Sequence, residues 1–137
     1  MSIYKTVFVY LGIAGFAGVY SAVYETLSHG VDSLWMITLF AWPLIGGAVP
    51  YAIIARFGQH VDLPWARLAH HSAVACATLG ACVTGVLQIY GTSSAWVWAY
   101  WIAAILLTIV TVVLAVTGVR RHHTDRVKAV LLGPNRD

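Results

Sequence analysis

Four long apolar stretches, separated by short polar breaks, constrain this chain more than any other feature. They run from about residue 4 to 24, 34 to 57, 65 to 90 and 96 to 119. Roughly 18 or more predominantly apolar residues are enough to cross the hydrocarbon core of a bilayer. Lipid offers the backbone no hydrogen-bond partner, so each stretch is expected to form a helix. We therefore predict an all-α polytopic membrane protein, an antiparallel bundle of four transmembrane helices.

Composition supports this class. Of 137 residues, 60% are apolar and only 9% are charged, whereas soluble domains carry about 25% charged residues. We expect one transmembrane domain over residues 1–119, followed by a basic cytoplasmic tail over residues 120–137.

The basic residues predict the orientation. The eight Lys and Arg residues fall at the start of the first stretch, around the second break or in the tail: Lys5, Arg56, Arg67, Arg120, Arg121, Arg126, Lys128 and Arg136. Cytoplasmic segments carry the excess of Lys and Arg, so we expect both termini in the cytoplasm and the first and third breaks outside. No nucleic-acid-binding motif accompanies these residues, and we expect no nucleic-acid partner.

The second stretch contains "WPLIGGAVPY", in which Pro43 and Pro50 bracket Gly46 and Gly47. Proline removes an amide donor and clashes with the preceding turn, so we predict a bend. Freed carbonyls could serve a ligand or an ion. We favour a packing kink over a binding role.

The first and third stretches each show a line of small or polar residues at helical spacing. On the third, His70, Ala77, Ala81, Thr84 and Gln88 share one face; on the first, the corresponding residues are Ala14, Gly18 and Ala22. Small residues let membrane helices approach closely. We predict that these two helices are central, packed against each other or across a homodimer.

The segment "YETLSHGVDS", at the first break, contains three residues that can carry a charge near neutral pH, in a part of the chain that otherwise has almost none. Glu25 and His29 are four residues apart, hence side by side on a helix, and Asp32 follows. In one interpretation Gly30 ends the helix, Asp32 or Ser33 caps the next, and Glu25 bonds His29 to brace the hairpin. In the other, Glu25, His29 and Asp32 bind a divalent metal.

A small ligand is the second occupant considered for this outer face. Its predicted binding residues are Glu25, His29, Gln88, Tyr90 and Trp42. For Trp42 we favour packing over stacking on a ligand. Haem is a less favoured cofactor with His70 as the alternative ligand, since an opposing axial histidine must come from another segment or a second subunit.

Three patches, "YETLSHGV", "WPLIGGAVPY" and "GVLQIYGT", resemble a group of short, uncharacterised four-helix membrane proteins of Gram-positive bacteria. The resemblance implies a multi-pass protein of the bacterial plasma membrane and implies no activity. It draws attention to six residues: Glu25, His29, Pro43, Pro50, Gln88 and Tyr90.

No Ser/His/Asp set, phosphate-binding glycine loop or HExxH motif is present, so the sequence gives an enzyme little to build on. Two functional classes remain. One is a non-catalytic binding or accessory module, which includes a subunit of a larger membrane assembly, and the other is a small oligomeric transporter or channel. A haem-binding membrane protein is a further alternative. We favour the module, because a transporter needs a polar path that the spans do not offer.

Overall fold

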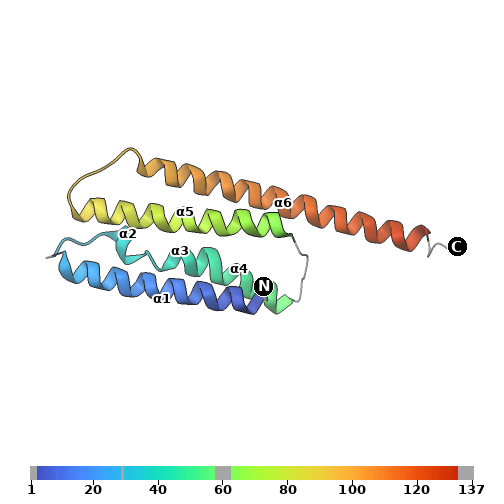
Figure 1. Ribbon diagram of the computed structural model, residues 1–137, viewed down its shortest axis with the longest axis horizontal. Helices are drawn as coiled ribbons and strands as arrows, with labels where there is room; N and C mark the ends of the chain where they lie inside the picture. The colour runs from blue at the N-terminus through green and yellow to red at the C-terminus, as the bar shows by residue number, and fades with distance from the viewer. Residues whose placement is uncertain (1–2, 29, 58–62, 133–137) are drawn as a thin grey trace.

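The computed structural model describes residues 3–28, 30–57 and 63–132, and every regular element within these ranges is helical. Three helices are long: α1 (Ile3–Leu27), α5 (Pro64–Ile89) and α6 (Val97–Leu132). Four short elements lie between α1 and α5: α2 (Leu34–Ile37), α3 (Ala41–Pro43), the π-helical turn η1 (Leu44–Ala48) and α4 (Val49–Phe57). The long helices and the interrupted segment run side by side (Figure 1).

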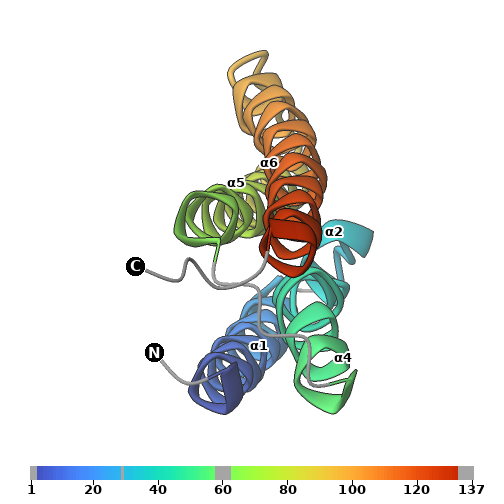
Figure 2. The ribbon, with the colours of Figure 1, turned by 90° about the vertical axis from the view of Figure 1, so that its right-hand side faces the viewer.

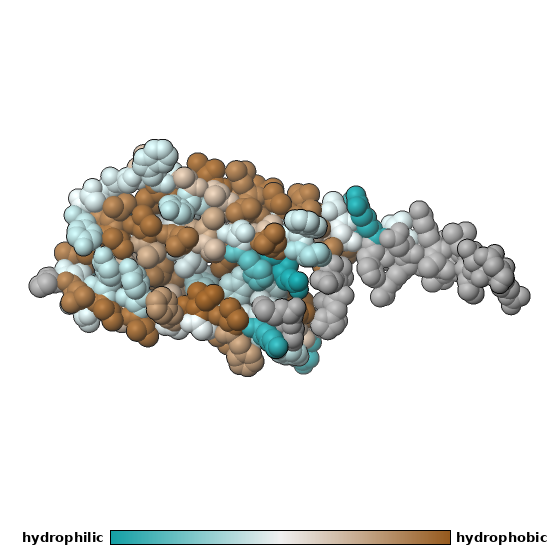
Figure 3. All heavy atoms as spheres, viewed as in Figure 1, coloured by the Kyte–Doolittle hydropathy of each residue, from teal (hydrophilic) through white to brown (hydrophobic). Residues whose placement is uncertain are grey.

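Three of these helices are long and apolar enough to span a membrane: Ile3–Leu27, Pro64–Ile89 and Val97–Arg121. Their outward side chains are apolar, as lipid requires. Phe8 and Phe16 on α1, for example, are 72% and 73% exposed. Apolar residues are spread over the face seen in Figure 3, while the most hydrophilic ones lie near the N-terminus and α4 and on α6 where its extension begins. The fold is therefore that of a multi-pass membrane protein.

The expected single helix over residues 34–57 is wrong, whereas the predicted distortion at its glycines and prolines is confirmed. Pro43 ends α3, the π-helical turn contains Gly46 and Gly47, and Pro50 lies in the first turn of α4. Proline has no N–H to donate to the helical hydrogen-bond pattern, so the α-helix is interrupted and continues as a π-helical turn. A Cβ on Gly47 would collide with the ring of Tyr10. Glycine is needed here because α1 approaches too closely for any side chain.

The interrupted segment lies between α1 and α5. Helix α1 packs against α2, α3, η1 and α4, whereas α5 packs against α6 and against α2, α3 and η1. The end-on view separates α1 and α4 from α5 and α6 in the same way (Figure 2). The backbones of α1 and α5 do not approach each other closely in the described residues, because the broken segment lies between them. The predicted packing of the first helix on the third is therefore limited to side-chain contacts, such as that of Tyr10 with His71. Pairing across a homodimer stays a prediction.

The buried faces differ in detail from the predicted ones. On α1 the buried residues are Thr6, Tyr10, Ala14, Ala17 and Ser21, so Ala14 is confirmed while Ala22 is exposed. On α5 they are Ala66, Ala69, Ala73, Val74, Gly80, Ala81 and Gly85. Ala81 is fully buried, but Gln88 is not. Helix α5 buries a wider arc than one stripe because it has neighbours on two sides.

Helix α6 continues to Leu132, well beyond the end expected near residue 119. The first part of the basic tail is thus a helical extension that projects past the other elements (Figure 1). Residues 133–137 lie outside the described ranges.

Candidate functional site

The turn that follows α1 is held by the carboxylate of Glu25. Gly30 adopts a φ of 89°, a left-handed conformation that glycine accepts at little cost. The chain then doubles back, and the backbone N–H of Ser33 donates to Glu25 Oε1 at 3.2 Å. Glu25 therefore braces the hairpin through Ser33. The predicted bond from Glu25 to His29 stays a prediction, because His29 lies outside the described residues.

Ser33 links this turn to α5. It occupies the N-cap position of α2, yet its hydroxyl makes no cap bond. Instead, Ser33 Oγ donates to Gln88 Oε1 at 2.8 Å, and the residue is only 1% exposed. A second buried bond, from Ser21 Oγ to the Met36 carbonyl at 2.6 Å, ties α1 to α2. Glu25, Ser33 and Gln88 thus form a chain of hydrogen bonds across three segments.

The end of α5 turns sharply above Gln88. Gly91 has a φ of 69°, and the Thr92 N–H donates to the Leu87 carbonyl at 2.9 Å. This pattern is a Schellman motif, in which a left-handed residue closes the helix. It reverses the chain after the helix end, so that Thr92, Ser93 and Ser94 line one pocket together with Gln88.

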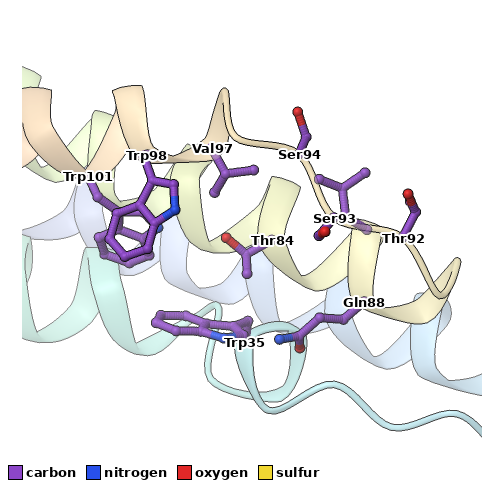
Figure 4. Close-up of a pocket in the computed structure, with 10 residues that line it drawn as sticks. Trp35, Thr84, Gln88, Thr92, Ser93, Ser94, Val97, Trp98 and Trp101 are labelled. Atoms are coloured by element: carbon purple, nitrogen blue, oxygen red, sulfur yellow. The ribbon is translucent and has the colours of Figure 1, made fainter.

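A pocket of about 310 Å³ opens between this turn, α2 and the start of α6. Its lining combines indole rings with neutral polar groups: Trp35, Thr84, Leu87, Gln88, Thr92, Ser93, Ser94, Val97, Trp98 and Trp101. Figure 4 shows the tryptophans toward one end and the polar side chains of Gln88, Thr92 and Ser93 toward the other. The volume is at the lower end of the range of small-molecule sites, about 300–1,000 Å³.

The predicted packing role of Trp42 agrees with its surroundings. Its ring lies 6.3 Å from that of Trp35 and 5.1 Å from that of Trp101, between ring centroids. Trp42 is absent from the pocket lining and packs against two of the three indoles that line it, those of Trp35 and Trp101.

The other predicted site residues are dispersed. Tyr90 is 73% exposed, hydrogen-bonds Tyr24 and does not line the pocket. Asp32 is exposed beside Ser33. Within the described ranges no group of three His, Cys, Asp or Glu residues could hold a metal ion. The metal set of Glu25, His29 and Asp32 includes one residue outside those ranges, so it stays a prediction.

A second polar cluster lies toward the opposite end of the bundle. Tyr10 Oη is 2.6 Å from His71 Nδ1, and Tyr51 Oη is 3.4 Å from His71 Nε2. The two ring nitrogens of His71 thus each hydrogen-bond a tyrosine, one from α1 and one from α4. A neutral imidazole has one N–H and one lone pair, so one tyrosine donates to it and the other accepts from it.

His70 is held beside this cluster. Its ring hydrogen-bonds the backbone of Gly46 and packs edge-on against Tyr51, with ring centroids 5.5 Å apart. The remaining nitrogen, Nε2, is buried without a hydrogen-bond partner. The freed backbone of the π-helical turn is therefore used by His70. Haem ligation by His70 stays a prediction.

Sequence reasoning missed this cluster although a signal was present. Tyr10 lies seven residues from the start of α1, His71 seven residues from the start of α5, and Tyr51 six residues before the end of α4. Antiparallel neighbours place such residues at one depth. The hydroxyl groups of the pocket could not be found this way, because the turn at Gly91 positions them.

Comparison with protein families, curated proteins and solved structures finds no match to this chain.

Proposed function

We propose that this chain is a non-catalytic membrane module that binds a small ligand in the pocket between α2, α5 and α6. The observation that carries the proposal is the pocket itself, in which Trp35, Trp98 and Gln88 converge from three segments. A few fixed polar groups within a mostly apolar wall are typical of ligand sites. The bonds from Glu25 to Ser33 and from Ser33 to Gln88 support it, since they fix the polar end before a ligand arrives.

The membrane arrangement forms part of the proposal. The interrupted segment over residues 34–57 serves as the fourth span, so that both termini are cytoplasmic and the pocket faces outward. The distribution of Lys and Arg supports this orientation. The resemblance to membrane proteins of Gram-positive bacteria supports a bacterial plasma membrane. The apolar surface of α6 faces lipid in this arrangement, and a homodimer or a larger membrane complex stays a prediction.

A thermal-shift screen of soluble metabolites on detergent-purified protein tests the ligand site. Trp98→Leu should abolish a stabilising shift, because Trp98 lines the pocket. Trp96→Leu is the matched control, since Trp96 is 83% exposed and lies outside the lining. If a metabolite stabilises Trp98→Leu as much as the unmodified protein, the ligand binds elsewhere and the proposed pocket is refuted.

The same purified sample tests the metal and haem alternatives. Metal analysis and an absorption spectrum should detect a bound divalent ion or a Soret band if either cofactor is present. For a metal at the first turn, Glu25→Gln and His29→Ala should lose the ion while helicity and detergent-extracted mass stay unchanged. If both variants instead fail to fold, the two residues only brace the hairpin.

A small transporter is a second candidate, favoured by one observation. His71 and its two tyrosines form a hydrogen-bonded chain inside the bundle, and ionisable residues within membrane segments often mark transport pathways. Tyr10→Phe should abolish proton-coupled uptake into proteoliposomes if this candidate is correct. Tyr4→Phe, at a 64% exposed residue of the same helix, is the control.

A further inference from the structure

The pocket has two chemically different ends, and together they specify a ligand class. Indoles from α2 and α6 form one end, and the amide of Gln88 with the hydroxyls of Thr92 and Ser93 forms the other (Figure 4). A ligand that satisfies both ends must itself have two unlike ends.

The indole end suits a diffuse cation. Trp35 and Trp101 lie 5.1 Å apart between ring centroids, and Trp42 contacts both from behind, so the rings are fixed. Trp98 completes this wall. An indole face attracts a cation within about 6 Å of its centroid. A quaternary ammonium group has no N–H to satisfy, so an aromatic wall without acceptors can receive it.

The polar end suits an oxyanion. The side-chain carbonyl of Gln88 already accepts the Ser33 hydroxyl, which leaves the amide N–H groups of Gln88 as donors toward a ligand. Thr92 and Ser93 add hydroxyl donors at the same end. Amide and hydroxyl donors are the groups that bind a carboxylate or phosphate oxygen when no basic side chain is available.

The pocket lining carries no charged side chain, and this favours a ligand with no net charge. None of the described lining residues is charged, and the sequence contains no Lys or Arg between residues 6 and 55 or between 68 and 119. A net ion of either sign finds no counter-charge in this lining and is therefore disfavoured. A zwitterion carries its own counter-charge.

We propose that this pocket binds a net-neutral zwitterion, with its quaternary ammonium group against the tryptophans and its oxyanion at Gln88, Thr92 and Ser93. The inference rests on the proposed ligand-binding function of the same pocket. Two sources supply this chemistry: a free betaine, and the phosphocholine headgroup of a lipid.

Calorimetric titration of the full-length protein in phosphatidylglycerol nanodiscs tests the ligand class with three probes. Glycine betaine carries both charges, 3,3-dimethylbutanoate replaces the ammonium nitrogen by carbon, and choline lacks the oxyanion. Betaine should bind saturably and at least about tenfold more tightly than either analogue. Trp98→Leu should weaken betaine binding about two- to fivefold, the scale of one cation–π contact at an exposed ring, and Trp96→Leu should leave it unchanged.

Each outcome is decisive for the zwitterion. Equal binding of 3,3-dimethylbutanoate, or no saturable binding of betaine, overturns this inference. The proposed function would still stand if a metabolite of another class bound with the same dependence on Trp98. Repeating the titration in phosphatidylcholine nanodiscs separates the two sources: a weakened apparent affinity identifies the lipid headgroup as a competing occupant, and an unchanged affinity identifies a free zwitterion.

Discussion

At the scale of single residues, the two functional regions depend on a few polar side chains that bond across segments. Ser33 is the clearest case, because its N–H donates to Glu25 and its hydroxyl to Gln88. One small residue thereby joins the first turn to α5 and fixes the side chain that forms the polar end of the pocket.

Replacing Glu25 separates its role as an acceptor from its role as a charge. Glu25→Ala removes the acceptor for the Ser33 N–H and should lower the free energy of unfolding by about 1 kcal/mol. Glu25→Gln keeps a carbonyl oxygen at nearly the same position, so the loss should be smaller. Equilibrium unfolding in mixed micelles, followed by circular dichroism, measures both. Equal losses for the two variants would show that the negative charge matters and that the hydrogen bond does not.

Residue-level expectations from sequence were partly correct for a physical reason. The segment with Glu25 and Asp32 stood out because charge is rare in the apolar half of the chain, and Gln88 stood out as a polar residue late in an apolar helix. Ser33, Thr92 and Ser93 could not be predicted, since serine and threonine are ordinary loop residues until a turn brings them together.

At the scale of elements, the interrupted segment determines the architecture. The prolines and glycines correctly predicted a distortion, but not its extent. The extent depends on whether neighbouring helices supply contacts and hydrogen bonds that compensate for the broken helix. Here Tyr10 packs against Gly47 and His70 bonds the backbone of Gly46. Neither contact is visible in the local sequence.

Gly47→Ala tests the close approach of α1 to η1. The added methyl group would overlap the Tyr10 ring, and overpacking typically costs about 1–3 kcal/mol. Gly15→Ala is the control, because a methyl group added there would have no neighbour within 4 Å, and alanine favours the helix. Thermal unfolding in detergent should show a lowered midpoint for Gly47→Ala alone. Equal midpoints would mean that α1 and η1 are not in close contact.

Ala81→Leu tests the buried face of α5. Ala81 is 0% exposed and belongs to a cluster with Ala17, Met36 and Leu39, so the larger side chain should destabilise the fold by about 1–3 kcal/mol. Ala75→Leu makes the same substitution at an exposed residue of the same helix and should be nearly silent. Equal tolerance in a detergent unfolding assay would show that the wrong side of α5 has been assigned as buried.

At the scale of the whole molecule, the chain has a predominantly apolar body, a pocket at one end and its basic residues toward the other. The membrane class and the approximate limits of α1 and α5 followed from apolar length, since the bilayer imposes that length on any spanning helix. The extension of α6 to Leu132 did not, because polar residues also form helices and no local signal ends this one near residue 119.

Cysteine labelling in whole cells determines whether the pocket faces outward in a four-span protein, on which the proposed function depends. Single cysteines at Ser94, which lines the pocket, and at Thr124, an exposed residue on the extension of α6, are introduced into a background lacking Cys76 and Cys82. We predict that a membrane-impermeant maleimide labels the cysteine at Ser94 in intact cells and the one at Thr124 only after lysis. Labelling of Thr124 with protection of Ser94 in intact cells would show that the orientation is the reverse of the one proposed.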